Sequence, residues 1–260
     1  EMCIRDRYKL AGGCIVSRNI RVFGLGESNM ENILHDMMEK SANPTIAPYA
    51  RTSECFARVT AKADTPAECE KMLDPVVDEI LKLLGDDVYG VDVDSLEQVV
   101  GDGLRERKLT LAVAESCTGG LLSQKITAVP GASQMFALGI CTYTNEMKTA
   151  ILHVPESTLH TYTAVSPQTA IAMANGVAAL SHADFALSVT GYAGPGGGTS
   201  EHPVGTVFLG VAYHGTAFAV HLPFDQLGVS TREGVRQGTA VCAFGIAREI
   251  LMEESVCRNI

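Results

Sequence analysis

The feature that most constrains the fold is an apolar run that ends in a turn of small and polar residues. Leu109–Val113 has the length and composition of a buried strand, and the turn Glu115-Ser116-Cys117-Thr118-Gly119-Gly120 follows it closely. Leu121, Leu122 and Ile126 are then spaced as one face of a helix. The segment therefore predicts a strand, a turn and a helix, with Ser116 on the turn.

A serine in this position has two interpretations. The free backbone N–H groups of a helix start can hold an oxyanion or a phosphate, which suits a nucleophile. Serine and threonine are also ordinary helix caps, and the Gly119-Gly120 pair can simply let the helix approach the sheet. Within the catalytic interpretation Cys117 is a rival, but its neighbours supply no histidine partner, so Ser116 is preferred.

Composition limits the class of protein. The 260 residues are 46% hydrophobic and 19% charged, enough for a sizeable core in one large domain or two modest ones. The formal net charge of −10 argues against direct nucleic-acid binding, because contact with phosphates needs a basic face. No apolar run reaches the length of a transmembrane helix and no signal peptide is evident, so we expect a cytoplasmic protein without a membrane partner.

Cysteine and histidine spacing gives no metal site. The eight cysteines are scattered without a CxxC pair, which predicts reduced thiols rather than a disulfide framework. The histidines are dispersed too, and neither His182 with Asp184 nor His153 with His160 forms a convincing ligand set. We predict no metal and no cofactor.

Residues 18–92 predict a small α+β domain. A KH-like domain that clamps RNA needs a GxxG loop, and none lies between its helices, so we prefer a structural or spacer role. Residues 1–17 show no clear periodicity and stay unassigned, and the acidic, turn-rich segment Asp86–Asp94 marks a boundary. The predicted elements are strand Ile20–Phe23, a helix from Ser28, strands Thr45–Tyr49 and Glu54–Ala61, and a helix from Pro66 to about Gly85.

Residues 93–260 predict a three-layer α/β/α domain, so the chain as a whole belongs to the α/β class. Strands and helices alternate through most of this segment. The predicted helices are Leu96–Arg107, the one after Ser116, and others that begin near Asn145, Pro167 and Thr231; the strands are Leu109–Val113, Phe136–Tyr143, Phe185–Val189, Val204–Ala212 and Ala217–Leu222.

Tyr143 and Lys148 are candidates for proton transfer to and from Ser116. Tyr143 ends a predicted strand and Lys148 lies on the first turn of the next helix, where ligand sites of open α/β sheets collect. A buried lysine loses its proton more easily and can act as base to a serine, and a neighbouring tyrosine can orient it. Taken alone, this spacing favours a solvated lysine and a tyrosine that packs at the rim of the sheet.

Two further features could bind an anion. The glycine-rich stretch Thr190–Gly198 follows a strand, so its N–H groups can approach an anion closely, or it can be a flexible connection. Arg232 and Arg236 share a face near a helix start and would clamp a phosphate, or form a solvated basic face.

Seven motifs together resemble the CinA C-terminal domain over about residues 109–252. They occur in the family's order, and residues 20–92 resemble the small middle domain that precedes it in full-length members. The motifs are Ala114–Gly120, Pro130–Ser133, Tyr143–Lys148, Ala164–Ser166, Val189–Pro195, Pro203–Val207 and Arg232–Arg236.

The resemblance implies an amidase that converts nicotinamide mononucleotide to nicotinate mononucleotide and ammonia in pyridine nucleotide salvage. It implies Ser116 as nucleophile, Lys148 as base, Tyr143 as assistant, and Thr118 with the helix-start N–H groups as oxyanion donors. It also implies a homo-oligomer, a dimer. The substrate-binding residues would be Gly119, Gly120, Thr190, Gly191, Gly194, Arg232 and Arg236.

The chain departs from the family pattern in three ways. Tyr192 replaces the usual aliphatic residue, and Gly228–Thr231 lacks the usual Gly-Asp-Arg before Arg232. The large N-terminal domain similar to molybdopterin-binding proteins is missing, so its metal-dependent pyrophosphatase activity is not expected. The alternative to an enzyme is a non-catalytic nucleotide sensor or a protein-binding protein linked to competence or DNA damage.

Overall fold

The computed structural model describes residues 13–51, 54–229 and 231–257. They form two compact units, one that runs to Asp94 and one that begins at Ser95. Each unit has its own sheet and its own helices, and each is described by itself.

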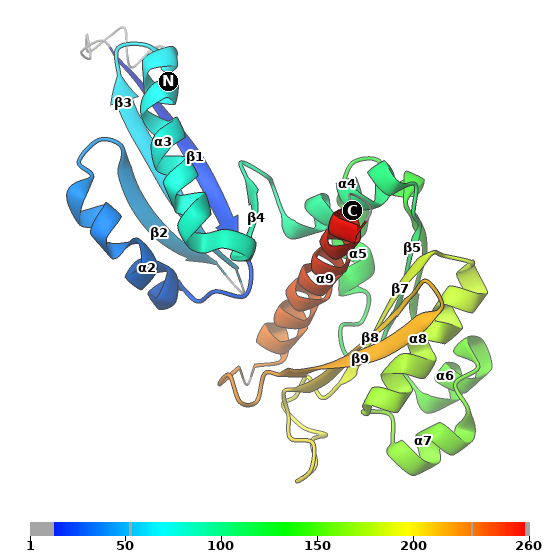
Figure 1. Cartoon of the computed structure of the whole chain (residues 1–260). Coiled ribbons are helices and arrows are strands. Elements are labelled where there is room, and N and C mark those ends of the chain that lie inside the picture. The colour runs from blue at the N-terminus through cyan, green and yellow to red at the C-terminus, as the bar shows by residue number, and fades with distance from the viewer. Residues whose placement is uncertain (1–12, 52–53, 230, 258–260) are drawn as a thin grey trace, which may run out of the picture. The chain divides into compact units, whose positions relative to one another are not determined.

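The first unit is an antiparallel sheet with two helices on one face (Figure 1). Its strand order is β2-β3-β1-β4, and α3 packs on β1 and β3 while α2 packs on β2. Buried Ile20, Val59, Leu73 and Ile80 belong to the core between sheet and helices. The elements are β1 (Cys14–Val22), α2 (Glu27–Lys40), β2 (Thr45–Arg51), β3 (Glu54–Ala63), α3 (Pro66–Leu84), a 3₁₀ turn η1 (Gly85–Asp87) and β4 (Val88–Val91).

Two strands of this unit extend into segments where the sequence predicted none. β1 begins at Cys14, inside the unassigned segment 1–17. The sequence does not predict this start, because Ile15 is apolar yet 68% exposed, so the apolar residues do not alternate with the buried positions. β4 lies in the acidic segment predicted as a boundary; it has only four residues and pairs with β1 at the edge of the sheet. A short strand at the edge of a sheet has too few residues to show a clear apolar and polar alternation.

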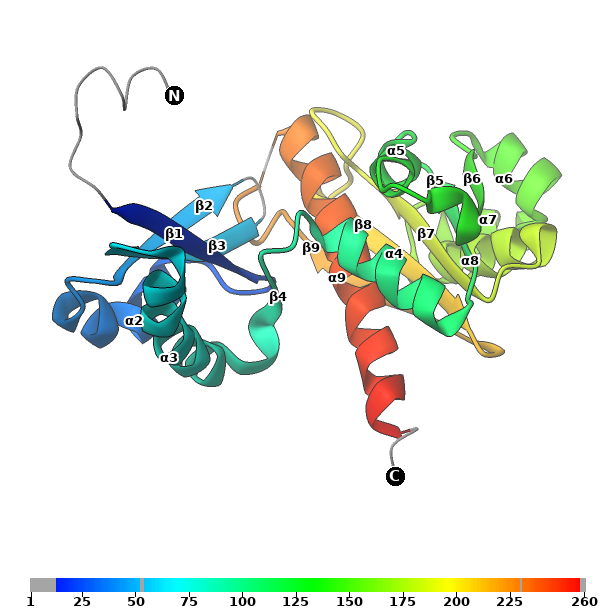
Figure 2. The same ribbon diagram turned by 90° about the horizontal axis from the view of Figure 1, so that it is seen from above.

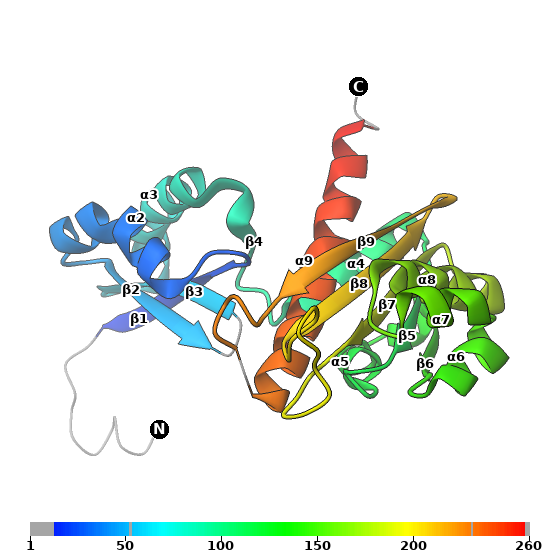
Figure 3. The same ribbon diagram turned by 90° about the horizontal axis from the view of Figure 1, so that it is seen from below.

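The second unit is a five-stranded sheet between two layers of helices (Figures 2 and 3). The strand order is β6-β5-β7-β8-β9, with β5, β6 and β7 parallel and β8 and β9 antiparallel to their neighbours. The elements are α4 (Leu96–Arg107), β5 (Leu111–Glu115), α5 (Leu121–Thr127), η2 (Ala132–Gln134), β6 (Phe136–Cys141), α6 (Asn145–Leu152), α7 (Glu156–Tyr162), α8 (Pro167–Ser181), β7 (Phe185–Gly191), β8 (Thr206–Tyr213), β9 (Thr216–Pro223) and α9 (Arg232–Cys257).

The layers confirm the predicted α/β fold class. Helix α8 covers one face of the sheet and carries α6 and α7 on its outer side, while α4, α5 and α9 lie together on the other face (Figures 1 and 2). Helix α7 was not predicted, because none of its residues is buried and it therefore shows no apolar face. No helix in the described ranges combines the length and hydropathy needed to cross a bilayer.

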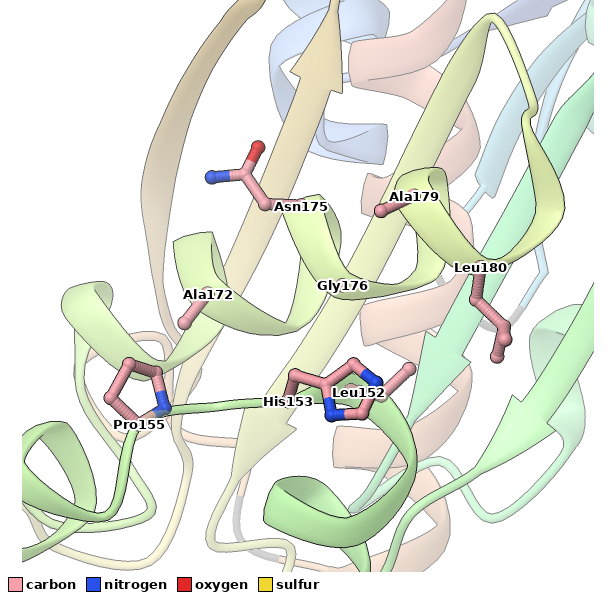
Figure 4. Close-up of a pocket in the computed structure, with 8 residues that line it drawn as sticks. All are labelled: Leu152, His153, Pro155, Ala172, Asn175, Gly176, Ala179 and Leu180. Atoms are coloured by element: carbon pink, nitrogen blue, oxygen red, sulfur yellow. The ribbon is translucent and has the colours of Figure 1, made fainter.

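A groove with a volume of about 600 Å³ lies between α8 and the segment that leaves α6 (Figure 4). Leu152 and His153 form one side, and Gly176 and Leu180 of α8 lie on the other. A side chain at Gly176 would collide with the Leu152 carbonyl oxygen, so the glycine permits the close approach of the two helices. None of the residues that line this groove is among the predicted site residues.

Candidate active site

The site is built where the three parallel strands of the second unit end. The hydrogen-bond ladder continues one residue past β5 and one residue past β6, since Ser116 N–H donates to the Val189 carbonyl at 3.1 Å and Thr142 N–H donates to the Glu115 carbonyl at 3.0 Å. Ser116 therefore has a fixed backbone between β6 and β7. The carboxyl ends of parallel strands are where open α/β sheets bind ligands.

The turn after β5 is held by Glu115, which is fully buried. Its carboxylate accepts hydrogen bonds from the N–H groups of Gly120, Leu122 and Ser123 at 2.9 to 3.0 Å, and from the Ser123 hydroxyl at 2.7 Å. Gly119 and Gly120 have φ of +59° and +98°, a region that favours glycine, and this turn brings the helix start back over Glu115. The N–H groups that the sequence argument assigned to an oxyanion are thus largely engaged by an acidic side chain.

Lys148 is the most deeply buried cation of the site, at 1% exposure. Its Nζ lies 3.2 Å from Ser116 Oγ, 2.9 Å from the Thr142 carbonyl oxygen and 3.3 Å from the Tyr143 carbonyl oxygen. Thr144 begins the helix that carries Lys148, because its hydroxyl accepts from Met147 N–H at 3.4 Å. The cap and the strand end together direct the lysine at the serine.

The environment of Lys148 makes its ammonium easier to deprotonate than that of an exposed lysine. Burial lowers the pKa of Lys148, and the weaker effects of Cys117 and Glu146 act in the opposite direction. A neutral amine has two N–H groups and one lone pair. Nζ donates to Ser116 Oγ and to the two carbonyl oxygens. When Lys148 loses a proton, the carbonyls, which can only accept, keep its two N–H groups, and the lone pair faces the hydroxyl proton of Ser116.

The rival nucleophile Cys117 lies in a different environment. Burial raises the pKa of Cys117 to about 12, and Glu115 acts in the same direction. At neutral pH this residue is therefore a thiol, which is a poor nucleophile compared with a thiolate.

Two buried hydroxyl groups flank the serine. Thr118 Oγ1 and Thr142 Oγ1 have no hydrogen-bond partner among the described residues. A buried hydroxyl without a partner costs free energy, and an oxygen atom of a ligand could satisfy it.

The two arginines of α9 reach the same edge of the sheet. Arg232 donates to the Gly194 carbonyl at 2.8 Å and to the Tyr143 hydroxyl at 3.2 Å. Arg236 donates to the Thr118 carbonyl through Nε at 3.2 Å and Nη2 at 2.9 Å. The arginines thereby connect the glycine-rich loop, the end of β6 and the turn that follows Ser116.

Tyr143 contacts this network through two different groups. Its carbonyl oxygen accepts from Lys148, whereas its ring is 58% exposed and its hydroxyl lies against Arg232. The sequence predicts a tyrosine side chain that orients Lys148 or relays a proton. In the structure the backbone of Tyr143 contacts the lysine, and the hydroxyl faces the side of the arginines.

The predicted loop residues have mixed surroundings. Thr190 donates its hydroxyl proton to the Ala164 carbonyl at 2.6 Å. Gly191 lies so close to β8 that a Cβ would meet the Thr206 carbonyl oxygen at 2.7 Å, which explains this glycine by packing. Gly119 is exposed and lies within reach of Arg236, so this part of the turn is open to a ligand.

Family comparisons agree with the resemblance in the sequence. A model described as CinA C-terminal domain matches residues 93–251, and a model described as Damage-inducible protein CinA KH domain matches residues 17–90. The chain belongs to the CinA family.

Individual CinA relatives cover most of the chain. A CinA-like protein from Desulfovibrio desulfuricans is 50% identical over 204 residues, 78% of this chain and 48% of the relative. A CinA-like protein from Dictyoglomus thermophilum is 46% identical over 243 residues, 93% of this chain and 58% of the relative. The chain therefore spans about half the length of the curated relatives it matches.

A solved structure gives the same family. The crystal structure of a CinA superfamily protein from Klebsiella pneumoniae is similar with a TM-score of 0.58 and 31% identity. It covers 61% of this chain and 96% of the other chain.

Glu115 is the residue of this CinA site that sequence reasoning passed over. The available signal was a carboxylate at the end of an apolar strand, just before a turn and a helix start, since acidic side chains stabilise helix N-termini. Its effect is to occupy the positive end of α5, so the substrate must find its donors elsewhere.

Proposed function

We propose that this chain is an amidase that hydrolyses the carboxamide of nicotinamide mononucleotide to nicotinate mononucleotide and ammonia. The observation that supports it best is the 3.2 Å contact between Ser116 Oγ and the buried Nζ of Lys148. Burial lowers the pKa of Lys148, and a lysine with a lowered pKa can act as base to a serine, which is the requirement for a serine nucleophile without histidine.

In the first half of the reaction Ser116 Oγ attacks the amide carbon while its proton moves to Lys148 Nζ. The tetrahedral intermediate then collapses as its C–N bond breaks, and Lys148 returns the proton to the leaving nitrogen, so ammonia departs. An ester between Ser116 and the nicotinoyl group is left behind.

In the second half Lys148 takes a proton from water, and the hydroxide oxygen attacks the ester carbon. The bond to Ser116 Oγ breaks, the serine recovers its proton from Lys148, and the new carboxylic acid releases its proton to solvent, so nicotinate mononucleotide leaves as a carboxylate. We assign oxyanion stabilisation to the Thr118 hydroxyl, which is buried without a partner, because Glu115 occupies the helix-start donors of Gly120, Leu122 and Ser123.

We assign recognition of the nucleotide phosphate to Arg232 and Arg236. Arg232 uses two of its N–H groups within the protein and is exposed, so it keeps donors for a phosphate. The Gly194 loop and the exposed Gly119 lie beside these arginines and would lie along the nucleotide. Tyr143, whose hydroxyl accepts a hydrogen bond from Arg232, would lie between the phosphate group and the carboxamide of the nucleotide.

The test is to incubate the purified chain with nicotinamide mononucleotide and to follow ammonia and nicotinate mononucleotide. We expect turnover that is lost in Ser116→Ala and kept in Cys117→Ala. Turnover lost only in Cys117→Ala would contradict the assigned nucleophile. No turnover with nucleotide binding intact would favour a sensor, and neither turnover nor binding would favour a protein-binding role.

A further inference from the structure

The first unit contains a pair of cysteines whose sulfur atoms touch. Cys14 is the first residue of β1 and Cys69 lies in the first turn of α3, and their Sγ atoms are 3.5 Å apart. Both are free thiols in the structure. Cys69 is fully buried, whereas Cys14 is half-buried, so one sulfur of the pair is open to a reagent from solution.

The fold holds the two sulfurs together through independent elements. Cys14 pairs with Ala63 at the end of β3, and α3 begins three residues later at Pro66. Thr65 caps that helix with a reciprocal pair of hydrogen bonds to Glu68, which fixes the turn that carries Cys69. Helix α3 then runs along β1 and β3 (Figure 1).

We propose that Cys14 and Cys69 are a modification site that forms an intramolecular disulfide when a small-molecule disulfide acts as oxidant. The two sulfurs already touch, and rotation of the side chains must bring them to a bond length of about 2.05 Å. The site lies outside the residues assigned to amide hydrolysis, so its test is independent of the test of the proposed function.

The reaction proceeds by two exchanges. Burial and the contact with Cys69 raise the pKa of Cys14, so the reaction is run at mildly alkaline pH, where the Cys14 thiolate displaces one sulfur of the oxidant to give a mixed disulfide and one small thiol. The Cys69 sulfur then attacks the Cys14 sulfur, forms the new bond and releases the second small thiol. Two cysteines are oxidised, one small disulfide is reduced, and the two cysteine protons end on the released thiols.

The bond would join the start of β1 to α3 across 55 positions of sequence. A crosslink over so long a loop restricts the unfolded chain strongly, and it also removes local fraying of the strand start. We expect amide exchange in the first residues of β1 and the first turn of α3 to slow by about tenfold or more in the oxidised form.

The experiment treats the full chain with oxidised glutathione, alkylates the remaining thiols under denaturing conditions, and maps the peptides by mass spectrometry. We expect loss of two of the eight thiols and a peptide pair that joins Cys14 to Cys69. Reduction with dithiothreitol should restore both thiols. Cys14→Ala should abolish the crosslink, while Cys55→Ala, a buried cysteine of the same sheet, should leave it unchanged.

Because the peptide mapping is done on the wild-type sequence, the test does not depend on how well a variant folds. A crosslink from Cys69 to Cys3, loss of thiols other than this pair, or retention of all eight thiols after full reaction of a control dithiol peptide would each overturn the proposal. Glutathione that stays attached to Cys14 without progressing to the disulfide would also overturn it.

Discussion

The two units of this chain differ in what they bury. Among the described residues, the buried polar or charged side chains lie in the second unit, including Glu115, Ser116, Thr118 and Lys148, apart from Tyr89 of the first unit, whose hydroxyl donates to Glu54. The described core of the first unit is apolar, with Ile20, Leu34, Leu73 and Ile80 as examples. Burying polar groups costs free energy unless they are paired, so their gathering around Ser116 supports this edge of the sheet as the candidate site.

The same contrast appears between one cation of each unit, Arg18 and Lys148. In the first unit Arg18 pairs with Glu70 and Asp92 while more than a third of its side chain is exposed, a setting in which an ion pair contributes little. In the second unit Lys148 is buried and contacts carbonyl oxygens and a hydroxyl instead of a carboxylate. The first arrangement supports structure, and the second can exchange a proton.

The largest effect is expected from Lys148→Met. This change keeps an apolar chain of similar length and removes the base, so we expect kcat for the nicotinamide nucleotide to fall by about 10²- to 10⁴-fold. Lys125→Met on α5 is the matched control. Lys125 pairs with Glu97 rather than with Ser116, so we expect kcat to stay nearly unchanged. Equal kcat in the wild type and Lys148→Met would remove the lysine from the mechanism.

Glu115→Gln should have the next largest effect. The amide group keeps the shape but presents N–H groups to backbone donors, so we expect a loss of stability of about 2 kcal/mol or more and a fall in kcat of about tenfold. Urea unfolding and steady-state kinetics measure both. Glu156→Gln, an exposed change at the start of α7, is the control, and stability equal to that of the control would show that the Glu115 cap is dispensable.

Arg232→Ala tests the binding side of the site. We expect KM for nicotinamide mononucleotide to rise by about tenfold with a smaller change in kcat, because a charge-assisted contact to phosphate is lost. Nicotinamide riboside, which lacks the phosphate, should respond to this change much less. The same increase in KM for both substrates would place the role of Arg232 in loop support, through Gly194, rather than in phosphate binding.

Leu73→Ala in the first unit should have the smallest effect on turnover. Leu73 is fully buried, so the cavity should lower stability by about 2 to 5 kcal/mol. At a temperature where the variant is fully folded, kcat should stay within about twofold of the wild type. A tenfold loss of kcat in the folded variant would contradict the functional division between the units.

Much of the second unit could be predicted because its signals are local. The strand before Ser116, the caps at Thr144 and Ser166, and the glycines of the turn are each visible in a short stretch of sequence. The family resemblance added which motifs belong together. The contact between Ser116 and Lys148 then follows from two neighbouring parallel strands ending at one edge.

The rest of the site depends on the directions of side chains and backbone groups, which a sequence pattern does not specify. Whether Glu115 turns into the helix start is decided by the left-handed backbone at Gly119 and Gly120. Which part of Tyr143 meets Lys148 depends on how the chain leaves β6, and the carbonyl rather than the ring takes that contact. Helix α7 and strand β4 carry too little apolar pattern to be seen before packing.

The measurement that tests the central claim most directly is the titration of Lys148 itself. Lysine labelled with ¹³C at Cε can be followed by NMR, with Lys148→Arg to assign the signal. The account predicts that Lys148 loses its charge at a pH clearly below the ordinary lysine value of 10.5, because burial lowers its pKa. A signal that titrates at or above that value would show a charged ammonium beside Ser116, which could not accept the proton of the serine.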